Sequence, residues 1–178
     1  MDVRRTARIM VIISMLGGIP TTGVALEPRG GVDDLPSVGN AAPARSTPWI
    51  SSSLPAPVRS RIEASFQVAS QRIVEAPECG ALFADLGADG IEMLSSTLYY
   101  PASAANEKKL CGGAWGYTTI GSAPTFLCRK FSRISEKRGA MILIHEALHH
   151  AGMVEFPNDP KGLTSKAINN LVEGACRL

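Results

Sequence analysis

The sequence predicts a small, disulfide-stapled α+β domain with a long N-terminal helix, a small antiparallel sheet, a central helix that carries the candidate site, and a C-terminal helix. Three observations predict this fold class. Apolar residues recur at helical intervals between Val58 and Ile73. Two β-prone runs, 115–119 and 125–129, are separated by a short segment with glycine and proline. All three histidines of the 178-residue chain lie within residues 145–150.

The first 25 residues have the pattern of a signal peptide. Three arginines precede an apolar stretch at 9–19 that is too short to span a bilayer with margin, and Gly23 and Ala25 form a small-x-small cleavage signal. Removal of residues 1–25 takes three arginines and Asp2 from 18 basic and 16 acidic residues, which leaves 15 of each. The mature chain is therefore near neutral, and we expect no nucleic-acid partner and no membrane span in it.

Residues 26–56 are expected to form a flexible linker or pro-segment, because they contain five prolines and few large apolar side chains. Residues 57–178 are then one domain of a size that supports a single core. No internal repeat is present, and we expect a monomer that is secreted or periplasmic.

The order of elements follows from local patterns. A helix is expected from Pro57 until Pro77, with short helical pieces at 81–86 and 88–94. Residues 98–100 are expected to form a short strand and 102–109 a polar loop, before the hairpin of the two β-prone runs.

The central helix is predicted with both of its ends. Ser135 is a typical N-cap, Glu136 lies in the first turn, and Gly152 is a helix-ending residue. Side chains four residues apart on a helix are offset by only about 40°, so His145 and His149 project from the same face. Two imidazoles placed in this way can share one zinc ion.

The residue between them fits the chemistry of a zinc hydrolase. Glu146 lies about 100° around the helix from His145, which is too far for a ligand but suitable for reaching a zinc-activated water. The carboxylate is expected to take the proton of that water as a general base.

The residues themselves leave the third metal ligand open. A carboxylate from Glu155, Asp159 or Glu173 could complete the site, since carboxylate oxygen is a normal zinc ligand. His150 is about 100° away from His149 around the helix, so it is interpreted as a surface or supporting imidazole.

The run His-Glu-x-x-His-x-x-Gly-x-x-Glu at 145–155 resembles the zincin metallopeptidases. Its spacing is similar to that of the metzincins, and the resemblance implies His145 and His149 as metal ligands, Glu146 as base, Gly152 as the turn and Glu155 as third ligand. In thermolysin-like zincins the third ligand is a later glutamate, which would favour Glu173.

Three departures define the prediction further. The metzincins have a histidine where this chain has Glu155, and no methionine follows Met153, so their downstream Met-turn is absent. The aspzincin pattern would use Asp159, but its surrounding signature is missing. We therefore expect a small, separate family of secreted, bacterial-type zincins with a zincin-like minimal domain.

The resemblance also implies where the substrate lies. Zincins hold an extended peptide along an edge strand, so the hairpin before the zinc helix is expected to bind substrate by strand addition. Tyr117 could donate a hydrogen bond to the oxyanion there, although core or rim packing is the favoured interpretation for it.

Four cysteines in an exported chain predict two disulfides. The favoured pairs are Cys111 with Cys128 across the hairpin, and Cys79 with Cys176. The second pair would staple the C-terminal helix, whose apolar face is expected to contain Ile168, Leu171, Val172 and Cys176.

Together these patterns predict a secreted zinc-dependent endopeptidase that hydrolyses protein or peptide substrates. The alternative is a non-catalytic secreted zinc-containing binding module, or an inactive peptidase homologue.

Overall fold

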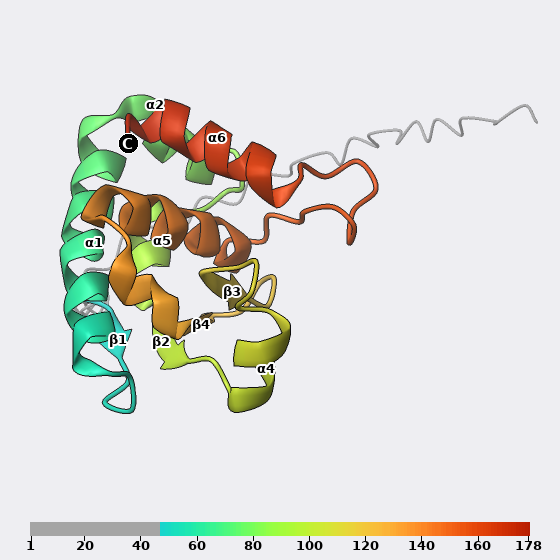
Figure 1. The fold of residues 1–178 in the computed structure, drawn as a ribbon. Helices are drawn as coiled ribbons and strands as arrows, with labels where there is room; N and C mark the ends of the chain where they lie inside the picture. The colour runs from blue at the N-terminus through green and yellow to red at the C-terminus, as the bar shows by residue number, and fades with distance from the viewer. Residues whose placement is uncertain (1–46) are drawn as a thin grey trace, which may run out of the picture. The chain divides into compact units, whose positions relative to one another are not determined.

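A computed structural model describes residues 47–178 (Figure 1). The predicted signal peptide and residues 26–46 of the predicted linker lie outside the described residues. The fold is α+β, as expected, with two disulfides. Its elements are, in order, β1 (Trp49–Ile50), α1 (Ala56–Glu75), α2 (Pro77–Ala84), α3 (Gly90–Ser96), β2 (Leu98–Pro101), α4 (Ala104–Lys109), β3 (Gly116–Thr118), β4 (Pro124–Leu127), the 3-10 helix η1 (Arg129–Arg133), α5 (Glu136–His150) and α6 (Ser165–Cys176). Among residues 47–178, no helix combines the length and apolarity needed to cross a bilayer.

The last part of the predicted linker belongs to the fold. Strand β1 pairs with β2, and the Ser51 amide donates to the Tyr99 carbonyl oxygen at 2.9 Å. Leu54 is only 2% exposed and is part of the hydrophobic core. The boundary predicted at residue 57 is therefore wrong for this segment. The sequence pattern missed the strand because two residues between prolines are too few to produce a period-2 pattern.

The sheet is mixed and not antiparallel. Its strand order is β1-β2-β4-β3, with β1 and β4 both parallel to β2 and only β3 antiparallel to β4. The predicted hairpin is confirmed as the β3–β4 pair. The prediction of a wholly antiparallel sheet is therefore wrong. Parallel neighbours need a long crossover connection. Helices α1–α3 provide it between β1 and β2, and the segment from α4 to β3 provides it between β2 and β4.

Residues 104–109 form a helix where a polar loop was predicted. The Ser103 hydroxyl caps this helix by accepting from the Asn106 amide at 3.2 Å. Alanine, glutamate and lysine are good helix formers, so the polar composition of α4 was a misleading signal.

Helix α5 is the centre of the domain. Every residue from Gly139 to His149 is buried, so this helix is covered on all sides. The predicted N-terminal helix, α1, packs against it, and α3, α6 and β3 also contact it. In Figure 1, α6 lies above α5 and strand β3 below it. The candidate site is therefore held by a helix that is buried among four other elements.

Both predicted disulfides are confirmed. Cys79–Cys176 joins α2 to the end of α6, and Cys111–Cys128 joins the segment before β3 to the end of β4. The buried face of α6 is narrower than predicted, because Leu171 is 39% exposed while its neighbour Val172 is fully buried.

Gly139 allows α1 and α5 to approach closely at Ser65. A Cβ atom at this position would lie 2.8 Å from Ser65 Cβ and closer still to the Ser65 hydroxyl. Gly139→Ala is therefore expected to lower the free energy of unfolding by about 1–3 kcal/mol through overpacking, measured by denaturant or thermal unfolding.

Gly174→Ala in α6 is the matched control. A Cβ there meets nothing within 4 Å, so this helix glycine is expected to give a gain of about 0.5–1 kcal/mol on replacement. Adding Ser65→Gly to Gly139→Ala is expected to recover stability. Equal effects of the two glycine substitutions would contradict the close contact.

Candidate metal centre

Helix α5 places His145 and His149 on the same side of the helix, one turn apart. The Ser135 side chain caps the helix by accepting from the Arg138 amide, as predicted, and the helix runs without interruption to His150. The two ring centroids are 4.7 Å apart in an edge-on arrangement, and the two Nε2 atoms are 3.0 Å apart.

The turn after α5 brings a carboxylate to these rings. Gly152 has a φ of 102°, a conformation that favours glycine, and the chain reverses there. Glu155 Oε2 then lies 3.9 Å from His145 Nε2 and 3.8 Å from His149 Nε2. The returning segment is held by a bridge to Leu163, whose carbonyl oxygen accepts from the Phe156 amide at 3.0 Å.

The far nitrogens of both rings have hydrogen-bond partners. His149 Nδ1 donates to the Met153 carbonyl oxygen at 2.7 Å, and His145 Nδ1 faces Asn169 Oδ1 at 2.9 Å. Because a carbonyl oxygen can only accept, the proton of each neutral ring lies on Nδ1. Both Nε2 atoms therefore present lone pairs toward each other.

This arrangement fits a bound cation. Two nitrogen lone pairs converge with Glu155 Oε2, a buried oxygen without a hydrogen-bond partner among residues 47–178. A tetrahedral zinc with bonds of about 2.0–2.1 Å spaces its ligand atoms about 3.3–3.4 Å apart. The three separations between these atoms, 3.0, 3.8 and 3.9 Å, bracket that spacing. Burial, followed by the nearby His149, lowers the pKa of His145 to about 4, although Asn169 raises it, so this ring is neutral at neutral pH.

The rival carboxylates are engaged elsewhere. Glu173 Oε1 accepts from Arg138 at 2.7 Å, and Asp159 Oδ1 accepts from the Lys161 amide at 2.9 Å. Within the described residues, Glu155 alone of the three joins the histidine cluster. His150 lies outside that cluster, as its position on the helix predicts.

Glu146 is buried beside the histidines and has a free oxygen. It is 5% exposed, and its Oε2 has no hydrogen-bond partner in the described part of the chain. Burial raises the pKa of Glu146 to about 7, with Thr118 and His149 opposing the shift and Glu155 adding to it. In the metal-free chain near pH 7, Glu146 is therefore present in both its charged and its protonated form.

A pocket of about 140 Å³ opens next to His145 and Glu146. Its walls come from the segment before β3, from α5 and from α6, and include Trp115, Ile142 and Ser165. His145 and Glu146 thus border a hollow that a side chain or small group can enter.

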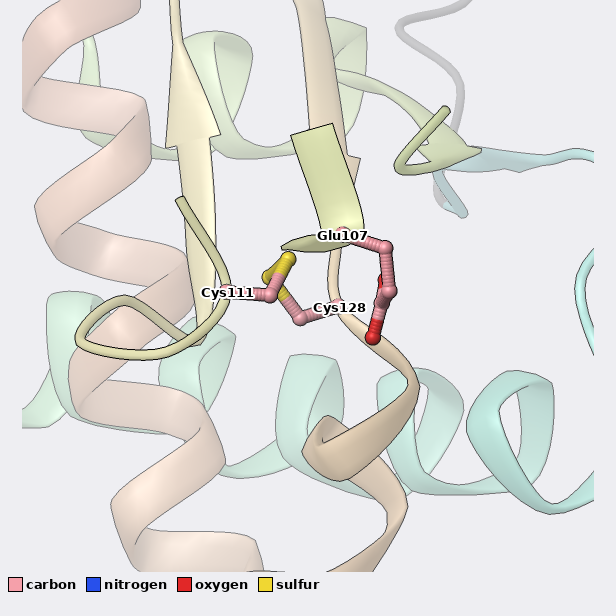
Figure 2. Close-up of side chains that lie close together, drawn as sticks. All are labelled: Glu107, Cys111 and Cys128. Atoms are coloured by element: carbon pink, nitrogen blue, oxygen red, sulfur yellow. A yellow bond between two sulfur atoms is a disulfide. The ribbon is translucent and has the colours of Figure 1, made fainter. Parts of the chain in front are cut away.

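A second cluster of metal-ligand types does not fit a metal. Glu107 lies beside Cys111 and Cys128, but the two sulfurs are bonded to each other, as Figure 2 shows. A disulfide has no thiolate to offer a cation. Glu107 Oε1 instead accepts a hydrogen bond from the Arg129 amide at 3.2 Å.

Tyr117 does not face the metal centre. Its ring stacks on Phe126 with centroids 5.2 Å apart, and its hydroxyl accepts from Asn106 Nδ2 at 2.8 Å. Side chains alternate along a strand, so its neighbours Gly116 and Thr118 are the β3 residues on the Glu146 side. This supports rim packing, the favoured interpretation, and not the oxyanion role.

The structure adds two groups that the sequence did not indicate, Asn169 and the Met153 carbonyl. The carbonyl follows from the Gly152 turn once the backbone is known. Asn169 is separated from His145 by 24 residues, and only its place one residue after the buried Ile168 distinguishes it from the exposed Asn170. No local pattern could have assigned it to the site.

Comparison with protein-family models, with curated proteins and with solved structures gave no match for this chain.

Proposed function

We propose that this chain is an exported zinc-dependent endopeptidase in which His145, His149 and Glu155 hold the metal and Glu146 is the general base. The arrangement is that of a zincin-like site with glutamate as third ligand.

One observation carries the proposal. The Met153 carbonyl and Asn169 leave both imidazole Nε2 atoms without a proton, 3.0 Å apart and facing an unpartnered carboxylate oxygen. Three electron-rich atoms brought together in a buried site repel one another unless a cation lies between them. Three protein ligands of nitrogen and oxygen type also leave a fourth position open, which is typical of catalytic zinc.

The chain's own residues then supply the acid–base chemistry. Zinc, when bound, polarises a substrate carbonyl and lowers the pKa of water. Glu146 follows His145 directly on α5, and its unpartnered Oε2 is available to accept a proton from the attacking water. The same carboxyl group then donates that proton to the leaving amine.

Strand β3 is the expected place for the substrate backbone. It is the last strand of the order β1-β2-β4-β3, so its outer edge has no strand partner among residues 47–178. A Cβ on Gly116 would lie 3.7 Å from Glu146 Oε1, which shows how closely β3 passes the base. A peptide added along this edge would lie beside Glu146 and the pocket near Trp115.

Export to an oxidising compartment is the expected context. The two disulfides fit a secreted or periplasmic protein. The predicted signal peptide would provide the route.

Incubation of the zinc-loaded full chain with a mixed peptide library tests the proposal. We expect internal peptide bonds to be cleaved. Cleavage should stop when a chelator removes the metal and should return when zinc is restored. Product analysis by mass spectrometry is the measurement.

The alternative function gives a different result in the same experiment. A zinc-containing binding module would retain the metal and leave every peptide intact. That result would contradict the peptidase assignment while leaving the metal site in place.

A further inference from the structure

Helix α6 supplies none of the three converging ligand atoms, yet it contacts the centre directly. Asn169 Oδ1 lies 2.9 Å from His145 Nδ1, on the side of the ring away from the converging Nε2 atoms. The contact joins residues 24 positions apart in the chain. The orientation of one candidate ligand therefore depends on an element outside the 145–155 motif.

The two histidines differ in how their proton position is set. For His149 the partner is the Met153 backbone carbonyl, which can only accept. For His145 the partner is a side-chain amide, which can present an oxygen or an NH₂ group. If the NH₂ group of Asn169 faced His145 Nδ1, the ring proton would move to His145 Nε2. That proton would then point at His149 Nε2, and a hydrogen bond between the two rings would replace metal coordination.

The rest of α6 holds Asn169 in place. Ile168 and Val172 are fully buried on either side of it, and Cys176 at the end of the helix is bonded to Cys79. Thr164 caps the start of the helix by accepting from the Ala167 amide. The amide of Asn169 is thus carried by a helix fixed at both ends.

We infer that Asn169 is a positioning residue for the metal centre: its Oδ1 accepts from His145 Nδ1, fixes the proton there, and directs the Nε2 lone pair of His145 at the metal. This inference rests on the proposed metal site and extends it to a residue outside the motif. Groups that hold the outer nitrogen of a ligand histidine typically contribute about 10–100-fold to metal affinity.

Zinc affinity and histidine tautomers in three variants of the full chain test the inference. Asn169→Ala is expected to weaken zinc binding about 10–100-fold in a competition assay with a chromophoric chelator. Asn169→Asp is expected to bind zinc at least as tightly as the wild type, because a carboxylate can only accept and makes the ring more basic. Asn170→Ala, an exposed neighbour of the same type, is expected to match the wild type.

A second measurement uses the metal-free protein, so its result does not depend on zinc binding. Nitrogen-15 NMR of the histidine rings is expected to show His145 protonated on Nδ1 in the wild type and in Asn169→Asp, and a mixture of tautomers in Asn169→Ala. Thermal unfolding of the metal-free variants confirms that each is folded.

The outcomes separate the two claims. Wild-type chain that binds no zinc would contradict the proposed function. Zinc binding by the wild type with equal affinity in Asn169→Ala, or equal weakening in Asn169→Asp and Asn169→Ala, would overturn the role of Asn169 alone. A wild-type His145 protonated on Nε2 in the metal-free protein would overturn that role and would also remove the observation that carries the proposed function.

Discussion

Replacement of Glu146 with glutamine is expected to lower kcat/KM for peptide cleavage by about 10²–10⁴-fold, the usual contribution of a general base. The amide has nearly the same size but cannot take up a proton from water. Because Glu146 is not among the three converging ligand atoms, the zinc content of Glu146→Gln should equal that of the wild type. Both quantities are measured on the same purified, zinc-loaded preparation.

Glu136→Gln is the matched control for this substitution. Glu136 lies on the same helix but in its first turn, where it is exposed and 3.6 Å from Arg61. Its replacement should leave kcat/KM unchanged. Wild-type turnover in Glu146→Gln would remove Glu146 from the role of base, and loss of zinc in that variant would mean that Glu146 acts through the metal site.

Replacement of His149 with alanine is expected to have the largest effect on metal binding. It removes one of the three converging atoms and leaves Glu155 and His145 without the geometry of a chelate. The loss of zinc affinity should exceed the roughly 100-fold effect of an outer group, since a direct ligand contributes more than the residue that orients it. Competition with a chelator of known affinity measures it.

The adjacent histidine provides a close control. His150→Ala changes the same residue type one position away on α5, outside the cluster, and should bind zinc like the wild type. Among the carboxylates, Glu155→Gln should weaken binding while Glu173→Gln should not, because Glu173 pairs with Arg138. Equal losses in His149→Ala and His150→Ala would contradict the assignment of ligands.

The parts of the fold that the sequence predicts are those encoded by local periodicity. The apolar spacing from Val58 to Ile73 predicts α1, and Ser135 with Gly152 predicts both ends of α5. The disulfide pairs were predicted because Cys111 and Cys128 lie on either side of a hairpin, which leaves the two remaining cysteines to pair with each other. The helix ends and the hairpin disulfide follow short-range rules, whereas Cys79–Cys176, with a sequence separation of 97, follows only once the other pair is assigned.

The parts that were missed depend on long-range or very short elements. Strand β1 is two residues long, and its parallel pairing with β2 is set by where α1 to α3 return the chain. At the site, the sequence left Glu155, Glu173 and Asp159 open on residue type alone. The fold brings Glu155 to the histidines through the Gly152 turn, whereas Asn169 reaches His145 only through the packing of α6 on α5.

The zinc content of the purified full chain tests the central claim most directly. After equilibration with zinc at micromolar concentration and removal of free metal by gel filtration, elemental analysis should find one zinc per chain. Wild-type protein that retains no zinc under these conditions would contradict the account, because the converging Nε2 atoms and the Glu155 carboxylate would then have no cation to hold.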